Sequence, residues 1–184
     1  RPPGMADAQP GYQFPPFWHL PPFFTLQPHA AVRAKQLDLW KQLARDYCAH
    51  HRVWVLDVSN AGRVGLFRNP ALQRQLTAEG LQALAEHLVA AGAAAWADGD
   101  RTRLLMYWRM PGEWADLILR WAESTGRIGS VETVLSLFDG DSTQGEQFHG
   151  APRELVMVAL QELERRGRAK VFRGATSGHE GVKF

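Results

Sequence analysis

Three residues with the side chains of metal ligands, Cys48, His50 and His51, lie within four positions of one another. A structural zinc site needs four ligands, which usually come as two closely spaced pairs. No second pair follows in this sequence, and Cys48 is its single cysteine. We therefore expect no metal and no other cofactor, but a buried cysteine on the apolar side of a helix and two solvated histidines at the helix end.

The polar stretch DGDSTQGEQFHG holds the other residues that could do chemistry. His149 could act as a general base, but no nucleophile, partner carboxylate or glycine-rich phosphate loop accompanies it. Asp139, Asp141 and Glu146 do not have the spacing of a calcium-binding loop. They are expected to form a solvated surface, which could also receive a basic partner. The chain is therefore predicted not to be an enzyme.

Apolar residues at helical spacing predict the elements of the first half of the chain. Trp40, Leu43 and Tyr47 lie on one stripe of a helix over residues 30–50. The elements expected after it are a strand over 53–58, a short helix that starts at Asn69-Pro70 and buries Leu72 and Leu76, a helix capped by Thr77 that ends at Gly92, and a hairpin with its turn at Asp98-Gly99.

The pattern restarts at Pro111, which suits the first position of a helix. Trp114, Ile118 and Trp121 form the apolar stripe of that helix, which ends at Gly126. The elements expected after it are a short helix capped by Ser130 that holds Val134, Leu135 and Phe138 inward, a helix from Pro152 to Gly167, and a closing hairpin of AKVF and GVKF.

The two halves repeat each other. Trp40 and Tyr47 align with Trp114 and Trp121, and the later positions from Leu81 to Gly99 align with those from Val156 to Gly174. Three helices followed by a hairpin, in units of roughly 75 residues, are typical of a winged helix. The sequence thus predicts an α+β, mostly helical fold: an extended proline-aromatic arm over residues 1–28, a first winged-helix domain over 29–109 and a second over 110–184.

Winged helices often bind DNA through the third helix, so nucleic-acid binding, as in a transcription-related protein, is the alternative function. The two candidate recognition helices are LTAEGLQALAEHLVAAG and PRELVMVALQELERRG. The first has no Lys or Arg, and acidic neighbours offset Arg153, Arg165 and Arg166 in the second. A phosphate-binding face needs cations clustered on one side, so the alternative would require these three arginines to form one basic surface.

Composition limits the chain to an ordinary folded class. Hydrophobic residues make up 45% and charged residues 22% of its 184 positions, and the formal net charge is +2. The sequence contains no apolar run of about 18 residues, the length that could span a bilayer. With a single cysteine, these features favour a cytoplasmic protein.

The stretch PPFWHLPPFFTLQP, from Pro15 to Pro28, places two Pro-Pro-Phe-aromatic blocks six residues apart. Proline pairs favour the stiff polyproline II conformation, which loses little backbone entropy when it docks on a partner. Two roles stay open. The blocks could bind a partner from an exposed arm, or their rings could fold back onto the first domain as a clasp. The clasp would use Phe14, Phe17, Trp18, Phe23 and Phe24. An exposed arm predicts that changing Phe23 and Phe24 to Ala breaks partner binding and leaves the melting temperature nearly unchanged.

This chain resembles the family of small vacuolar-protein-sorting subunits of the ESCRT-II complex. The resemblance runs in order from Tyr12 to Phe184. It rests on PPFWHLPPFFTLQP, RAKQLDLWKQLARDYC, LFRNPALQRQL, LLMYWRMPGEWADLILRWAESTG, EQFHG and GVKF. The resemblance implies two tandem winged helices and a non-enzymatic adaptor in endosomal, multivesicular-body sorting.

The same resemblance implies two protein partners and a location. The proline-aromatic blocks would dock on the two larger ESCRT-II subunits through Pro15, Pro16, Phe17, Trp18, Pro21, Pro22, Phe23 and Phe24. Trp18 and Phe24 stand where family members often have Tyr, so the polar part of this contact is in doubt. The second winged helix would recruit and nucleate an ESCRT-III subunit, with Glu132, Thr133, Asp139, Asp141 and Glu146 as candidate contacts. The protein would be cytoplasmic and would reach the endosomal membrane indirectly, through the complex.

Overall fold

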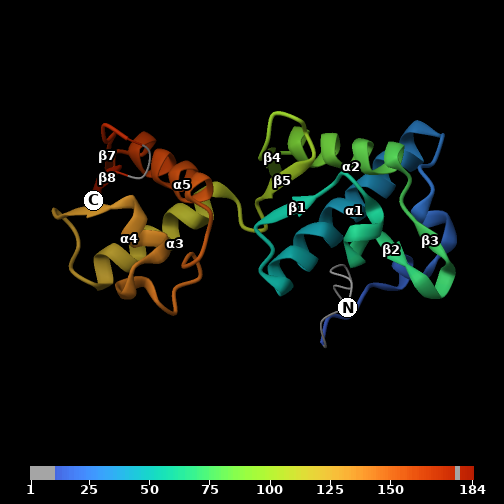
Figure 1. Cartoon of the computed structure of the whole chain (residues 1–184), viewed down its shortest axis with the longest axis horizontal. Coiled ribbons are helices and arrows are strands. Elements are labelled where there is room, and N and C mark those ends of the chain that lie inside the picture. The colour runs from blue at the N-terminus through green and yellow to red at the C-terminus, as the bar shows by residue number, and fades with distance from the viewer. Residues whose placement is uncertain (1–10, 177–178) are drawn as a thin grey trace. The chain divides into compact units, whose positions relative to one another are not determined.

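The computed structural model describes residues 11–176 and 179–184. Its contacts divide the chain into two compact units, Arg1–Trp108 and Arg109–Phe184, and each combines helices with a small antiparallel sheet (Figure 1). Among the described residues, none of the helices combines the length and apolar character that crossing a bilayer requires.

The first unit is built on two helices. They are α1 (Ala30–His51) and α2 (Ala78–Ala90). Its sheet has the strand order β1-β5-β4, from β1 (Val55–Asp57), β4 (Ala94–Trp96) and β5 (Arg103–Met106), and a two-stranded ribbon joins β2 (Arg68–Asn69) to β3 (Arg74–Gln75). Short 3₁₀ helices cover Pro16–His19, Pro21–Phe24, Ala61–Arg63, Gly65–Phe67 and Pro70–Leu72.

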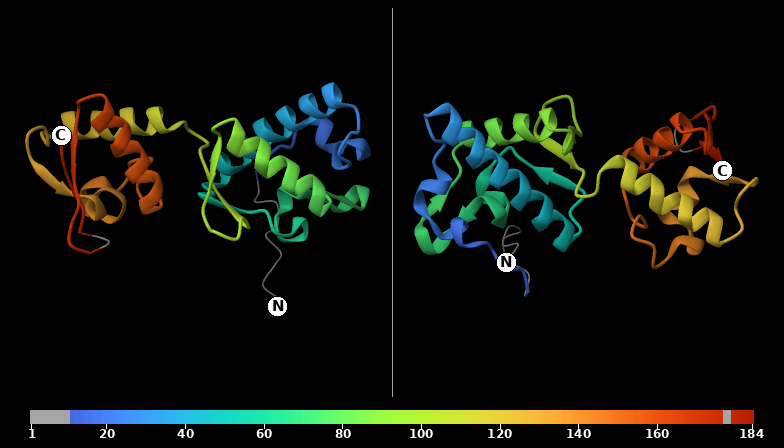
Figure 2. Two further views of the ribbon diagram at one scale, coloured as in Figure 1. Left: turned by 90° about the horizontal axis from the view of Figure 1, so that it is seen from above. Right: turned by 180° about the vertical axis from the view of Figure 1, so that it is seen from behind.

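In the described residues of the second unit there are three helices and one sheet. The helices are α3 (Pro111–Ser124), α4 (Val134–Asp139) and α5 (Arg153–Arg165), with a 3₁₀ turn over Asp141–Thr143. The sheet has the order β6-β8-β7, from β6 (Val131–Thr133), β7 (Lys170–Phe172) and β8 (Gly181–Lys183). Figures 1 and 2 show α3 and α5 side by side within this unit.

Local sequence signals correctly predicted where most helices begin and end. The Thr77 hydroxyl accepts a hydrogen bond from the Gly80 amide at 3.0 Å and so caps α2. Pro111 occupies the first turn of α3, as predicted. Gly92 and Gly167 follow α2 and α5 with φ of 70° and 71°, the left-handed conformation that glycine adopts without strain.

Two local predictions were wrong. The segment after Asn69 forms only a 3₁₀ turn, because Gln73 adopts a left-handed conformation and the chain then pairs as β3. The cap of α4 is Thr133 and not Ser130, because residues 131–133 form strand β6 and the helix begins only after it. The helix buries Val134 and Leu137, so Leu135 is exposed and not buried as expected.

Large side chains at repeated positions fill the two cores. Trp40 and Tyr47 of α1 are buried, and so are Trp114, Ile118 and Trp121 of α3. Leu84 and Leu88 of α2 are fully buried, as are their equivalents in α5, Ala159 and Leu163. The internal repeat in the sequence therefore corresponds to two cores built in the same way.

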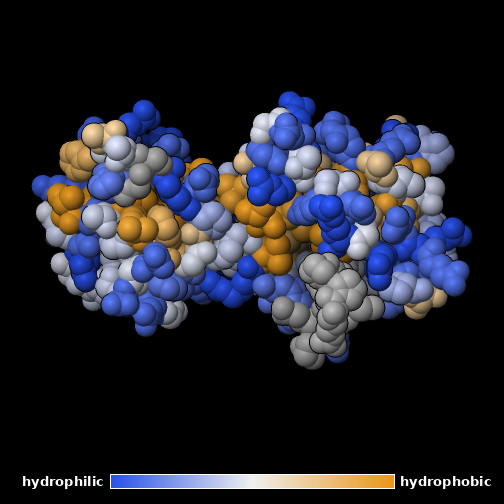
Figure 3. Space-filling model, in the orientation of Figure 1, coloured by the Kyte–Doolittle hydropathy of each residue, from blue (hydrophilic) through white to orange (hydrophobic). Residues whose placement is uncertain are grey.

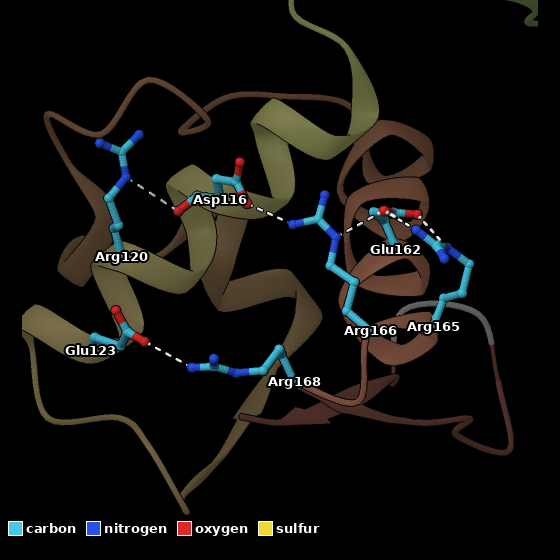
Figure 4. A network of polar contacts seen from close by, with 7 residues as sticks. All are labelled: Asp116, Arg120, Glu123, Glu162, Arg165, Arg166 and Arg168. Atoms are coloured by element: carbon cyan, nitrogen blue, oxygen red, sulfur yellow. Dashed lines mark hydrogen bonds and ion pairs between the residues drawn. The ribbon is translucent and has the colours of Figure 1, made fainter.

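Ion pairs join α3 to α5 on the surface of the second unit (Figure 4). The Arg166 guanidinium lies between two carboxylates, at 2.9 Å from Glu162 and 2.6 Å from Asp116. Arg165 lies 2.7 Å from the same Glu162, and Arg168 lies 2.9 Å from Glu123. Hydrogen bonds from Arg165 and Arg166 lower the pKa of Glu162 from its ordinary 4.5 to about 2.

This lowered pKa predicts a pH dependence of folding. In the folded protein Glu162 stays ionised at pH values where the unfolded chain already has it protonated. Its contribution to the free energy of unfolding is therefore present above about pH 4.5 and is lost as the pH falls towards 2. Urea unfolding of the second unit, followed from pH 7 to pH 2, should show a shallower decline in Glu162→Gln than in the unchanged protein. Equal declines would mean that Glu162 does not couple folding to protonation.

Candidate functional site

The two proline-aromatic blocks form consecutive 3₁₀ helices, Pro16–His19 and Pro21–Phe24. Prolines occupy the first turn of each, and backbone hydrogen bonds close the turns from Trp18 to Pro15 and from Phe23 to Leu20, both at 3.0 Å. The prediction of an extended arm was therefore wrong for these residues. The fixed φ of proline suits a 3₁₀ turn as well as polyproline II, and packing decides between them.

Aromatic rings from the blocks complete the core of the first unit. Phe23 stacks on Trp40 of α1, with ring centroids 4.2 Å apart and planes 10° apart, and Phe24 meets the same indole edge-on at 5.5 Å. Phe14 stacks on Trp18 with centroids 3.7 Å apart. Trp18, Phe23 and Phe24 are all buried. The blocks are thus a clasp that belongs to the fold (Figure 2, dark blue, beside α1).

Buried polar side chains fix the backbone of the clasp. The Trp40 indole donates to the Phe23 carbonyl at 3.0 Å, and the Trp18 indole donates to the Leu66 carbonyl at 2.9 Å. The Gln36 amide donates to the carbonyls of Phe23 and Thr25, and Asn69 donates to that of Trp18. Gln36 and Asn69 were missed by sequence reasoning, because a polar residue on a helix or in a turn usually faces water.

An apolar groove remains open between the clasp and α1, and we call it the arm groove. It has a volume of about 430 Å³ and is lined by Phe17, Leu20, Pro22, Phe23, Gln27, Val32, Lys35, Gln36 and Leu39. Leu20, Val32 and Leu39 expose 56%, 48% and 43% of their surfaces. Three exposed aliphatic side chains therefore surround this one groove.

The eight candidate residues in the blocks divide into two groups. Trp18, Phe23 and Phe24 point into the core, although Phe23 also lines the arm groove. The others keep some or all of their surface in solvent: Pro15, Pro16, Phe17, Pro21 and Pro22. The structure therefore separates residues that form the surface from residues that hold it in place.

The five candidates in the second unit do not form one acidic patch. Glu132 is paired with Arg127 at 2.9 Å, and the Thr133 hydroxyl is used to cap α4. Asp139 and Asp141 are exposed near the end of α4, and Glu146 is half-buried in the following loop. Leu135 lies four residues before Asp139 and exposes 49% of its surface, so α4 presents an apolar and an acidic side chain on one face.

The cysteine and the histidines considered above as chemical groups are held in packing and hydrogen-bond contacts. Burial raises the pKa of the Cys48 thiol to about 12, so it stays protonated. His50 and His51 pack their rings against Tyr12, and His149 contacts the Thr143 hydroxyl at 2.9 Å. Over residues 11–176 and 179–184, no cluster of three or more His, Cys, Asp or Glu side chains is arranged to hold a metal ion.

The arginines of α5 do not form the basic face that DNA binding would need. Arg153 forms a short ion pair with Glu180, and Arg165 and Arg166 share Glu162. A second hollow, in the first unit, is polar and has a volume of about 300 Å³, with Arg68 and Arg74 in its lining. Neither hollow lies on the helices that a winged helix presents to DNA.

Comparison with known proteins identifies the family. The family model described as "ESCRT-II complex subunit" matches residues 11–152 of this chain, from the clasp to the start of α5. The chain belongs to the ESCRT-II subunit family. Vacuolar protein-sorting-associated protein 25 of Danio rerio is 37% identical over 173 residues, which cover 94% of this chain and 95% of that protein.

Solved structures agree with this ESCRT-II assignment. Subunit VPS25 of the endosomal trafficking complex ESCRT-II has 26% identity and a TM-score of 0.81, over 92% of this chain and 98% of that one. A chain in the endosomal complex ESCRT-II (VPS22/VPS25/VPS36) has a TM-score of 0.78 over the same shares of the two chains and the same identity. Both likenesses extend over the two units described above.

Because the blocks form a buried clasp, we expect the opposite effect on stability from the one that an exposed arm predicts. Changing Phe23 and Phe24 to Ala should lower the free energy of unfolding of the first unit by at least about 3–5 kcal/mol, because it empties part of the core. Chemical denaturation monitored by tryptophan fluorescence would measure the loss. Leu20→Ala, at an exposed position, should change stability by less than about 0.5 kcal/mol. An unchanged melting temperature in the double variant would show that the blocks are not part of the core.

Proposed function

We propose that this chain is a non-enzymatic adaptor subunit of an ESCRT-II complex that acts in endosomal, multivesicular-body protein sorting. Family membership supports the assignment, since a similar chain occurs in the structure of the endosomal complex ESCRT-II (VPS22/VPS25/VPS36). Two larger subunits are then the direct partners. The protein works in the cytoplasm and is recruited to the endosomal membrane by the complex, and the proposed role requires no cofactor.

In this proposal each unit is a winged helix. The second unit supports the assignment best, since α3, α4 and α5 are followed by the β7-β8 hairpin, which β6 extends to three strands. In the first unit, α1 and α2 precede the β4-β5 hairpin, and short 3₁₀ turns stand where a second helix would be. We assign the first winged helix to residues 29–109, with the clasp added to it, and the second to residues 110–184.

The arm groove carries the docking proposal. Its exposed aliphatic residues, Leu20, Val32 and Leu39, offer an apolar surface that a partner can bury. Phe17, Pro21 and Pro22 extend this surface along the clasp. The proline turns and buried hydrogen bonds fix the clasp before the partner arrives, so docking costs little conformational entropy. Trp18, Phe23 and Phe24 act indirectly, by holding this surface in shape.

Charged substitutions in the groove test this role without emptying the core. Leu20→Asp with Leu39→Asp should weaken binding to the two larger subunits by at least about 30-fold, because an apolar contact would have to bury two carboxylates. Isothermal titration of the purified partners would measure it. Leu135→Asp, at an equally exposed leucine of the second unit, should bind as the unchanged chain does. Equal binding by all three proteins would exclude the arm groove as the docking site.

The second unit is proposed to recruit an ESCRT-III subunit through α4 and the loop that follows it. Leu135 and Asp139 share one exposed face of α4, and Asp141 and Glu146 follow in the loop. A basic amphipathic helix could place its apolar side on Leu135 and its cations near the carboxylates. Glu132 and Thr133 contribute by fixing the start of α4.

Charge and apolar contact should affect this second interaction differently. Asp139→Lys with Asp141→Lys should slow association with the ESCRT-III subunit and reverse its salt dependence, because steering by opposite charge is lost. Leu135→Asp should mainly speed dissociation. Stopped-flow kinetics separate the two effects, and the Leu20→Asp/Leu39→Asp variant serves as the control. Unchanged rates in both α4 variants would place the ESCRT-III site elsewhere.

A further inference from the structure

Positive charge is concentrated in the last twenty residues of this sequence. Residues 165–184 contain six of the 21 basic side chains and one of the 19 acidic ones, which leaves 15 basic and 18 acidic side chains in the rest. The single acidic residue, Glu180, is buried and paired with Arg153. The net charge of +2 therefore conceals a run of cations at this end of the sequence. Carboxylates outside the segment pair with three of them, Arg165, Arg166 and Arg168.

The sheet of the second unit turns two of these cations outward. In the antiparallel register, Lys183 of β8 lies opposite Val131 of β6 on one side and Lys170 of β7 on the other. Directly opposed residues share a face of the sheet, so these three form one row. Val182, the next residue of β8, is fully buried and marks the opposite face as the one on the core. Lys170, Lys183 and Val131 thus face solvent.

A second row on the same face brings an aromatic side chain beside the lysines. Gly181 lies opposite both Thr133 and Phe172, two residues along from the first row. Phe172 exposes 45% of its surface and Val131 exposes 63%. We call this surface, formed by Val131, Lys170, Phe172 and Lys183, the wing face. Apolar residues reach the molecular surface in the part of Figure 3 where β7, β8 and the C-terminus lie in Figure 1.

Acidic groups near the wing face are already engaged. Glu164 accepts a hydrogen bond from the Val171 amide and lies 3.8 Å from the Lys170 ammonium, which stays 70% exposed. Glu132 belongs to the opposite face of the sheet and is paired with Arg127. The wing face therefore presents two ammonium groups with an aromatic ring and an aliphatic side chain next to them.

We propose that the wing face binds the surface of an anionic lipid bilayer directly. Lysines near a bilayer are attracted to its negative surface potential, and an exposed Phe gains free energy by entering the boundary between headgroups and acyl chains. Nucleic acid would also attract the lysines, but it offers no apolar phase for Phe172 and Val131. Lys170, Phe172 and Lys183 lie outside the arm groove and outside α4, so changing them tests this contact independently of the proposed docking interactions.

Sedimentation of the full chain with vesicles tests the proposal. At about 0.15 M salt, the protein should partition onto phosphatidylcholine vesicles that contain about one third phosphatidylserine, and not onto phosphatidylcholine alone. Lys170→Glu with Lys183→Glu should lower the partition coefficient by about 30-fold or more, since each lysine near the surface contributes about a five-fold factor. Phe172→Ser should lower it several-fold with no change in net charge.

A matched control separates the wing face from net charge. Arg68→Glu with Arg74→Glu makes the same charge change at exposed residues of the first unit, and this variant should bind vesicles as the unchanged chain does. Equal losses in the two charge-reversed proteins would overturn the proposal, as would equal binding to neutral and anionic vesicles. Tighter binding to duplex DNA than to vesicles, lost in the lysine variant, would assign the wing face to nucleic acid instead. Circular dichroism of each variant confirms that its fold is retained.

Discussion

The indole of Trp40 is the contact on which the first unit depends. It lies on the buried side of α1, stacks against Phe23, meets Phe24 edge-on and donates its hydrogen bond to the Phe23 carbonyl. One side chain thereby satisfies a backbone acceptor and covers two aromatic rings, so the clasp cannot leave without exposing both. The shape of the arm groove follows, because one of its walls is the clasp and the other is α1.

Much of the fold could be predicted from the sequence, because the signals that define it are local. Helical spacing, the Thr77 cap, Pro111 and the positive-φ glycines act within a few residues of one another, and the helices they mark are present. The failure at the proline-aromatic blocks involves contacts over longer distances. Proline pairs alone cannot show that Gln36 and Asn69 hold their backbone, since Gln36 is 13 residues from the Phe23 carbonyl and Asn69 is 51 residues from the Trp18 carbonyl.

The candidate surfaces were less predictable than the fold for the same reason. Residues of the blocks were named as one group, but their division into core and surface depends on packing against α1. The arm groove joins Leu20 to Leu39, and the wing face joins Val131 to Lys170, which becomes apparent only when strand register is known. The net charge of the whole chain also does not show where its cations are concentrated.

The burial of the clasp changes what a partner of this ESCRT-II family member would recognise. The groove is a discontinuous epitope, with one wall from residues 17–23 and the other from residues 32–39, joined by Gln27. A free peptide that copies the proline-aromatic stretch would carry every ring but neither the α1 wall nor the hydrogen bonds to Gln36 and Trp40. Under the proposed docking, recognition is tied to the integrity of the whole first unit, and an incompletely folded subunit would be left out of assembly without a separate checking step.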